Sequence, residues 1–392
     1  MTALIPRSLQ PFLTLSYPVP ATVDGRHVTL WDKGINDVYF VIGVATGLTA
    51  LRHLLMMWVF YPIGRLVVPL PALGGHKGQS TEATLKHKRS QDRKHHHNLV
   101  RFAEQAWSLS YCTLTWSLST IILRSIPNYT SPEELWGTYP AFPIPALSKF
   151  VYLLQLGWWN HQIYVIHAEK RRKDHWQMFG HHILTIALMT TSYYANFTRI
   201  GILVHWLMDG ADIFLPLAKI LRYMDFSTAC DATFVMFLLV WVVSRQIGLF
   251  LVTRSAYVQG PKYLPFDYAP EKGYYFTRNA WLMFVAMLST LLCLCTMWFY
   301  MAVMVAVRVV RGQGAADSRS DDEDDGEEDV ADDDDSVDTP IRTPDTDSSM
   351  NALHNSFASE AAAALKNADP RGSGSRSGSG SDDSDADLRR RR

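Results

Sequence analysis

The chain is poor in charged residues and in cysteine, and both shortages restrict what it can be. Of its 392 residues only 19% are charged while 48% are hydrophobic, and the hydrophobic ones are gathered in long blocks. Such blocks are typical of a protein that crosses a membrane several times. The four cysteines lack the paired spacing of a zinc site or of a secreted disulfide framework, so we expect them to be core residues.

A cleavable secretory signal is not visible either. Residues 1–35 contain four prolines and have no basic stretch followed by a short apolar core. We therefore expect residues 1–35 to form a lumenal segment, and residues 36–61 to be the first transmembrane helix and to act as a signal anchor.

Seven apolar blocks are long enough to cross a bilayer, because a membrane-spanning helix needs about 20 mostly apolar residues. The blocks are residues 36–61, 100–124, 148–168, 179–197, 200–222, 231–254 and 279–309. The sequence therefore predicts an all-α polytopic membrane protein with about seven transmembrane helices.

Basic residues indicate how these helices are inserted. Lysine and arginine cluster in the loops after the first, third and fifth blocks, at residues 86–94, 170–173 and 219–222. The positive-inside rule places such loops in the cytosol. With seven spans, the N-terminus is then lumenal and the C-terminus cytosolic.

The net charge of −1 hides two regions of opposite charge. From residue 311 onward there are 22 acidic and 10 basic residues, against 16 acidic and 27 basic before it. Residues 312–392, rich in Asp, Ser and Gly, are expected to be a disordered acidic cytosolic tail. The basic body suits anionic lipid headgroups or a phosphate-bearing substrate.

Two kinds of modification remain open from the sequence. In the tail, Ser318, Ser320 and Ser384 precede acidic residues, and Thr339 and Thr343 precede proline, which fits regulatory phosphorylation as well as chance matching. In the predicted lumenal loop, the sequon at Asn128 is either glycosylated or too close to the membrane to be modified. The sequon at Asn196 falls in a tight turn and is read as a coincidence.

Polar side chains recur at helical spacing in two neighbouring apolar blocks. Steps of three or four residues place side chains on one face of a helix. The fourth block carries His181, Thr185, Leu188, Ser192 and Asn196, and the fifth carries His205, Asp209, Asp212, Pro216 and Lys219. A short turn joins the blocks, so both stripes can face one cavity, with Asp212 roughly 5 Å along the axis from the pair His181–His182.

These stripes favour chemistry over mere helix packing. Ionisable groups at membrane depth are costly and usually line a functional path. A buried carboxylate beside an imidazole can orient its tautomer and stabilise the imidazolium, as in an acid–base dyad. The simpler reading is that one His and one Asp tie two helices together, but two histidines and two carboxylates on matched faces favour catalysis.

Two other classes fit less well. Membrane desaturases and hydroxylases hold two irons with closely spaced histidine boxes, whereas His161, His167, His175 and His205 are isolated and the run His95–His97 lies in a basic loop. No metal site is therefore expected. A transporter of this size usually shows an internal repeat or paired broken helices, and none is found.

The stretch 181–219 resembles the signature of the ceramide synthases, the longevity-assurance branch of the TLC-domain family. The matching residues are His181, His182, Thr185, Leu188, Ser192, Tyr193, Asn196, Arg199, Gly201, Asp209, Asp212, Leu215 and Lys219. The charged run 169–174 and the segment 101–107 extend the resemblance to about residues 95–310. Met208, where animal members have histidine, is similar to fungal members.

The resemblance implies a six-helix TLC domain around an intramembrane tunnel, preceded by one anchor helix. It implies that a sphingoid long-chain base, dihydrosphingosine or phytosphingosine, is N-acylated by fatty acyl-CoA at the endoplasmic reticulum, with no metal or other cofactor. His181, His182, Asp209 and Asp212 are the implied catalytic residues. One histidine acts either as the general base or as the acyl acceptor, and the sequence does not decide between them.

The resemblance also implies binding residues and partners. The implied substrate-binding residues are Ser192, Tyr193, Asn196, Arg199, Lys219, Arg171, Arg172 and Lys173. The cytosolic basic residues among them, in the run 170–173 and at Lys219, fit contact with the CoA phosphates and fit membrane topology equally well. Implied partners, besides membrane lipids, are a small single-span regulatory subunit and a second copy in a homo- or heterodimer, and nothing points to nucleic acid.

The length of the acyl chain should depend on how deep the tunnel runs and on what closes it. We expect the determinants in the last two spans and in loop 255–278, whose five tyrosines fit the role of lumenal interface anchors better. A non-enzymatic lipid carrier or sensor of the TLC type and a membrane transporter are the alternative functions.

Overall fold

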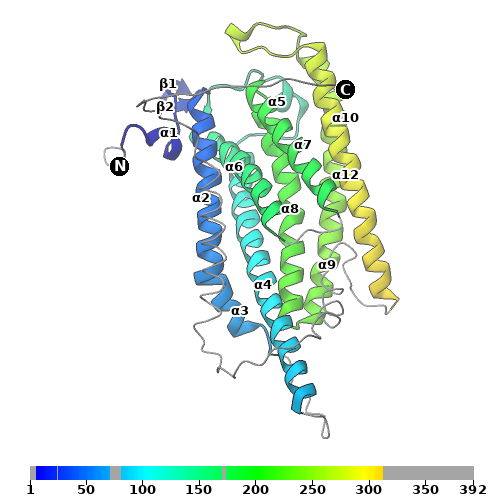
Figure 1. Ribbon diagram of the computed structural model, residues 1–392. Coiled ribbons are helices and arrows are strands. Elements are labelled where there is room, and N and C mark those ends of the chain that lie inside the picture. Colours follow the sequence, from blue (N-terminus) through cyan, green and yellow to red (C-terminus); the bar gives the residue numbers. More distant parts are fainter. Residues whose placement is uncertain (1–5, 24, 71–80, 170–173, 312–392) are drawn as a thin grey trace, which may run out of the picture. The chain divides into compact units, whose positions relative to one another are not determined.

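Long helices account for most of the computed structural model, which describes residues 6–23, 25–70, 81–169 and 174–311 (Figure 1). These residues belong to one compact unit, Met1–Val330. The predicted tail and its phosphorylation sites lie outside the described residues, as do Arg171, Arg172 and Lys173.

Seven long helical segments are found among the described residues, near the predicted positions. They are α2 (Asn36–Leu55) continued by η2 (Met56–Phe60) and α3 (Tyr61–Val67); α4 (Thr81–Arg124); α6 (Ala146–Ala168); α7 (His175–Tyr194); α8 (Thr198–Tyr223); α9 (Ser227–Trp241) continued by η3 (Val242–Gly248) and α10 (Leu249–Val258); and α12 (Arg278–Val310). By length and composition, four of them can cross a membrane: 36–67, 198–223, 227–258 and 278–308. That all seven cross it stays a prediction.

Two boundaries differ from the sequence-based expectation. The first segment continues to Val67 rather than ending near residue 61, because η2 and α3 carry the helix on past α2. Helix α4 begins at Thr81, so His95–His97 lie on a helix and not in a basic loop. Lysine, arginine and glutamate are good helix formers, and the scarcity of apolar residues there predicted only that this stretch lies outside the membrane.

Small elements gather at one end of the helices (Figure 1). They are α1 (Gln10–Leu13), the strands β1 (Pro18–Val23), β2 (Arg26–Trp31) and β3 (Ile144–Pro145), α5 (Pro132–Trp136), α11 (Gly260–Tyr263) and η4 (Pro270–Lys272). The strands form an antiparallel sheet in the order β1-β2-β3, with Pro18 opposite Trp31 and Trp31 opposite Ile144. Strand β2 is thus tied to the start of α6.

Helix α8 is the centre of the bundle. It packs along α4 and α9, and it is the most buried of the four apolar segments. The chain reverses between α7 and α8 in three residues, where Asn196 adopts the left-handed conformation (φ 68°) that asparagine tolerates better than most residues.

A close approach explains the glycine of the signature. A Cβ atom at Gly201 would lie 2.6 Å from the ring of Tyr152, so only glycine lets α6 pack against α8 here. The Tyr152 hydroxyl donates to the carbonyl oxygen of Met189 at 3.1 Å, which adds α7 to the same contact. Helices α6, α7 and α8 are therefore fixed relative to one another beside the predicted site.

Candidate active site

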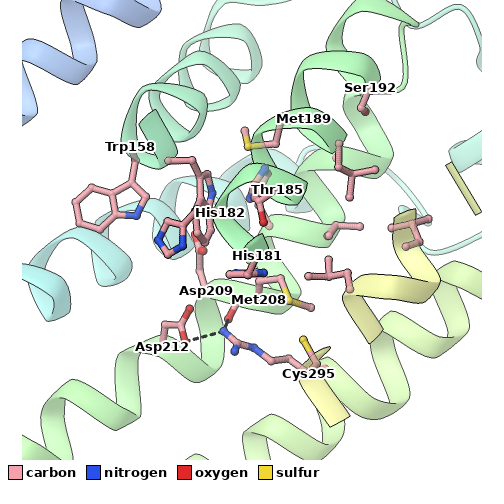
Figure 2. A pocket seen from close by; sticks show the side chains of 18 of the residues that line it. Trp158, His181, His182, Thr185, Met189, Ser192, Met208, Asp209, Asp212 and Cys295 are labelled. Carbon is pink, nitrogen blue, oxygen red and sulfur yellow. Dashed lines mark hydrogen bonds and ion pairs between the residues drawn. The ribbon is translucent and has the colours of Figure 1, made fainter. Parts of the chain in front are cut away.

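A cavity of about 300 Å³ lies between α6, α7, α8, η3 and α12 (Figure 2). Both polar stripes contribute to its wall, through His181, Thr185, Leu188 and Ser192 of α7 and His205, Asp209, Asp212, Pro216 and Lys219 of α8. The prediction that the two stripes face one cavity is confirmed for these residues. Asn196 is the member of the stripes that does not line it.

The two histidines sit among aromatic rings inside this cavity. The His181 ring stands nearly perpendicular to those of Trp159 and Trp298, with ring centres 5.4 and 5.2 Å away. The His182 ring contacts Trp159 as well, at 5.2 Å. Such walls exclude water, so the imidazoles meet a bound substrate in an environment where electrostatic interactions are strong.

Backbone contacts assign the tautomer of His182. Its Nδ1 lies 2.6 Å from the carbonyl oxygen of Met178, one turn earlier on α7. A carbonyl oxygen can only accept, so Nδ1 carries the hydrogen and Nε2 of the neutral ring has the free lone pair. His182 is therefore held ready to accept a proton through Nε2.

His181 differs from its neighbour because its Nδ1 is buried without a hydrogen-bond partner among the described residues. Unsatisfied buried polar atoms are rare and usually have a reason, such as a catalytic role. Here the atom belongs to a ring that lines the cavity, which makes the cavity's ligand the natural partner.

The carboxylates are held by other groups than the imidazoles. Asp209 Oδ2 accepts hydrogen bonds from Thr115 Oγ1 at 2.9 Å and from Gln155 Nε2 at 2.5 Å. The Gln155 amide is oriented in turn by the Tyr111 hydroxyl, which donates to its Oε1 at 3.2 Å. Asp209 is thus fixed by α4 and α6 rather than by α7.

Asp212 forms an ion pair that the sequence analysis missed. Arg245 Nη2 lies 2.6 Å from its Oδ1 and also donates to the carbonyl oxygen of Met208 at 2.8 Å. The guanidinium lies 4.1 Å from the ring centre of Trp241, a cation–π contact. Arg245 comes from the π-helical segment η3, which interrupts the apolar segment 227–258. An arginine inside an apolar block was the signal that could have identified it.

The expected imidazole–carboxylate dyad differs from these contacts. Asp209 and Asp212 bind Thr115, Gln155 and Arg245, whereas Nδ1 of His182 binds a backbone carbonyl oxygen. The carboxylates share the cavity with the histidines, and their expected catalytic role stays a prediction.

Three of the predicted substrate-binding residues lie away from the cavity wall. The Tyr193 hydroxyl donates to Asp37 Oδ2 at 2.9 Å, Arg199 forms an ion pair with Glu134, and Asn196 Nδ2 donates to the Gly273 carbonyl oxygen at 2.8 Å. Helical spacing alone could not show that the N-terminal segment and loop 125–147 cover this end of α7 and α8. These signature residues therefore bind other parts of the chain.

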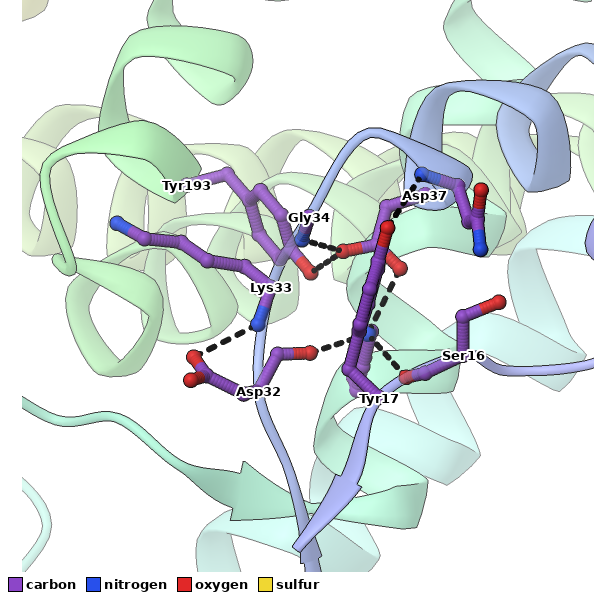
Figure 3. A network of polar contacts seen from close by, with 9 residues as sticks. Ser16, Tyr17, Asp32, Lys33, Gly34, Asp37 and Tyr193 are labelled. Carbon is purple, nitrogen blue, oxygen red and sulfur yellow. Dashed lines mark hydrogen bonds and ion pairs between the residues drawn. The ribbon is translucent and has the colours of Figure 1, made fainter.

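Tyr193 belongs to a polar cluster that we call the Lys149 network (Figure 3). Lys149 is fully buried, forms an ion pair with Asp37 at 2.7 Å, and donates to the carbonyl oxygens of Ser16 and Asp32 at 2.9 and 2.5 Å. Asp37 Oδ2 also accepts from the Gly34 N–H at 2.9 Å. Beside this network, Lys33 donates to Tyr194 O and to Asn196 Oδ1, so the N-terminal segment is bound to the α7–α8 turn.

Of the predicted binding residues, Ser192 and Lys219 remain in the cavity wall. Lys219 lies near the end of α8, two turns beyond Asp212, whereas Ser192 lies close to the α7–α8 turn. The charged side chains of Asp212 and Lys219 thus lie toward one end of the cavity, and the aromatic rings of Trp136, Phe197 and Phe276 line the other end together with Ser192. Among the described residues, no three His, Cys, Asp or Glu side chains are grouped as a metal would require.

Comparison with known proteins identifies the family of this chain. The TLC domain profile matches residues 101–304. Sphingosine N-acyltransferase lag1 of Schizosaccharomyces pombe is 36% identical over 313 residues, which cover 80% of this chain and 72% of that protein. A ceramide synthase of Gibberella moniliformis is 31% identical over 336 residues, with 79% and 72% covered. Human ceramide synthase 5 is 28% identical over 244 residues, with 60% and 57% covered.

These matches identify the chain as a member of the TLC-domain family. Within that family it is an acyltransferase of the fungal ceramide synthase branch, so the resemblance seen in the sequence is confirmed.

Proposed function

We propose that this protein joins a sphingoid long-chain base to the fatty acyl group of acyl-CoA, giving a dihydro- or phytoceramide and free CoA. The observation that carries the proposal is the histidine pair in a cavity with charged side chains toward one end and aromatic rings at the other. Both substrates combine a long hydrocarbon chain with a polar reacting end, which such a cavity can accommodate.

His182 is the residue best prepared for proton transfer. The sphingoid ammonium must lose a proton before its nitrogen can attack the thioester carbonyl carbon, and Nε2 of His182 can accept it. The new C–N bond forms and the C–S bond breaks. The nitrogen loses two protons in going from ammonium to amide, of which one ends on the CoA thiolate and the other is released to water. The net reaction needs no other cofactor.

His181 allows an alternative route in two chemical steps. Its ring can accept the acyl group from the thioester and pass it to the amine, which splits one difficult step into two. The two routes differ in one measurable respect. Incubating the protein with acyl-CoA alone, followed by intact-mass analysis, detects an added acyl group only if an acyl-imidazole forms, and His181→Ala compared with His182→Ala identifies the acceptor.

The ion pair between Arg245 and Asp212 has an electrostatic role in the proposal. It places a guanidinium and a carboxylate in the wall beside the histidines. The carboxylate attracts the ammonium of the base, and the guanidinium balances the carboxylate when no substrate is present. Asp209, which accepts two hydrogen bonds, keeps the same wall rigid.

The end of the cavity with the charged side chains is proposed to take the CoA moiety. Lys219 lines it, and Arg171, Arg172 and Lys173 precede α7 in the sequence. Arginine and lysine bind phosphate oxygens through charge-assisted hydrogen bonds. In the proposed orientation this end faces the cytosol and the protein resides in the endoplasmic reticulum membrane.

The decisive experiment supplies sphingoid base and a panel of acyl-CoAs to microsomes that contain the protein and lack other ceramide synthases. Microsomes retain any small single-span subunit or second copy that the enzyme requires. We expect amide and free CoA in equal amounts. The double variant His181→Ala/His182→Ala is the control, and equal amide formation by this variant would contradict the proposal. Lipid binding without any amide would instead support a carrier or sensor.

A further inference from the structure

The cavity is closed at the α7–α8 turn by an element outside the last two spans. Its wall there includes Trp136, the last residue of the short helix α5, together with Phe197 and Phe276. Trp136 is only 5% exposed, and its ring packs edge-on against Phe197 with ring centres 6.3 Å apart. A bulky ring therefore covers this end of the cavity.

Trp136 is fixed from two directions. Its indole N–H donates to Ser255 Oγ at 2.9 Å, and the Ser255 hydroxyl donates to Gln259 Oε1 at 2.5 Å. From another direction its ring packs against Phe197, and beside it lies Gly260, where an added Cβ would be in ordinary van der Waals contact with the ring at 3.7 Å. The ring can neither swing into the cavity nor leave it without breaking these contacts.

The rest of α5 is anchored as well. Glu134 pairs with Arg199 of α8, and Glu133 Oε1 accepts from the Tyr263 hydroxyl at 2.6 Å. Ser131 caps the helix by accepting from the Glu134 N–H at 3.2 Å. The signature residue Arg199 thus holds the helix that carries Trp136.

Resting on the proposed function, we infer that Trp136 is the end stop for the acyl chain and sets the longest chain that the enzyme uses. The CoA group is large and polar and stays at the Lys219 end, so the acyl tail extends past the histidines toward Trp136. Between His181 and Ser192 the cavity wall follows α7 for eleven residues, which at 1.5 Å per residue is a length of about 16 Å. An extended acyl chain advances by roughly 1.2 Å per bond, so this length holds about 14 of its bonds.

The test is a competition assay with an equimolar mixture of acyl-CoAs that increase in length by two carbons. The products of Trp136→Ala and Trp136→Leu are compared with those of the unaltered protein by mass spectrometry. A product ratio within one reaction does not depend on how much protein is folded. We expect both variants to prefer a longer acyl chain than the unaltered protein does, with the larger change in Trp136→Ala. The reason is that each additional methylene group that becomes buried raises the affinity for the acyl-CoA roughly fourfold.

Two further variants separate positioning from general damage. Arg199→Leu frees α5 while keeping Trp136, and we expect a smaller shift in the same direction. Trp107→Leu is the matched control, because Trp107 is equally buried and does not line the cavity. We expect its product ratio to be unchanged while its thermal stability falls.

A second series keeps the acyl-CoA fixed and varies the length of the sphingoid base, because both substrates carry a hydrocarbon chain. A shift that follows the base and not the acyl chain would overturn the inference, as would an unchanged acyl ratio in both Trp136 variants. Loss of all products in both variants at normal abundance would assign Trp136 to folding and overturn it too. Failure of the unaltered protein to form amide would instead contradict the proposed function.

Discussion

Two buried polar clusters lie near the two ends of α7, and they differ in whether their groups are satisfied. In the Lys149 network, Lys149 has three oxygen partners, and Asp37 pairs with Lys149 and accepts from Tyr193 and the Gly34 N–H. In the cavity, His181 Nδ1 has no hydrogen-bond partner in the part of the chain that the structure describes, and its ring lines the cavity wall. Satisfied buried clusters stabilise a fold, whereas unsatisfied ones facing a cavity indicate a site. The signature contains residues of both kinds.

The largest effect that this comparison predicts is on catalysis at the cavity. Replacing His182 by alanine removes the proton acceptor, and we expect amide formation to fall by about 10³-fold, within the range for loss of a general base. Initial rates in microsomes at equal protein abundance measure this. Thermal stability should change little because the ring faces the cavity. A variant that keeps more than a tenth of the activity would contradict the role of His182.

Next in size is a change in stability without a change in chemistry. Lys149→Met leaves Asp37 buried and without its counter-ion, and breaking such a pair costs about 3 kcal/mol or more. Thermal unfolding in detergent measures this, and the activity per folded molecule should be preserved. Lys33→Met is the control, because Lys33 is half-buried and should matter less. A specific loss of turnover in Lys149→Met would place this network in the mechanism.

The ion pair of Asp212 should give an intermediate effect on catalysis. Arg245→Gln leaves the carboxylate uncompensated in the cavity wall, and we expect roughly a 10²-fold loss of activity, or about 2.7 kcal/mol. Because the two groups interact directly, Asp212→Asn combined with Arg245→Gln should lose less than the two single losses together. Strict additivity of the two losses would show that they act independently.

The smallest predicted effect is the dependence of stability on pH at Lys33. Burial against aromatic rings lowers the pKa of Lys33 from 10.5 to about 8, although Asp32 raises it in part. Between about pH 8 and 10.5 the unfolded chain therefore binds a proton that the folded chain lacks, so stability from this group rises with pH through that window. Measuring the free energy of unfolding of the unaltered protein and of Lys33→Met at pH 7.5 and 9.5 isolates the stability that Lys33 adds as the pH rises. Solvent screening keeps this gain below about 1 kcal/mol. An identical pH response in both proteins would contradict it.

The sequence predicted the long helices and the shared cavity because both depend on local patterns. Apolar blocks and steps of three or four residues are properties of single helices. What it could not predict depends on parts of the chain that are far apart in sequence. The Tyr193 hydroxyl binds Asp37, which follows the N-terminal segment, and Asp212 pairs with Arg245 of η3.

Helical spacing also could not distinguish the members of one stripe. Ser192 and Asn196 are one turn apart on the same predicted face, yet Ser192 lines the cavity and Asn196 begins the reversal to α8. The loop containing α5 is another example, because its apolar tryptophan gives no sign in the sequence that it closes a cavity formed by other helices.

The π-helical segment η3 affects which deletions the segment 227–258 can tolerate. A π-helical stretch turns through a smaller angle per residue than an α-helix, so it holds about one extra residue. Deleting one residue there, such as the exposed Val243, would let the segment close into a continuous α-helix while α10 keeps nearly the same orientation. The same deletion at the start of α10 would instead rotate the residues after it by about 100°, and Val252 and Ala256, now buried, would turn away from the core. Within this segment, a shorter chain is therefore tolerated better at η3 than in α10.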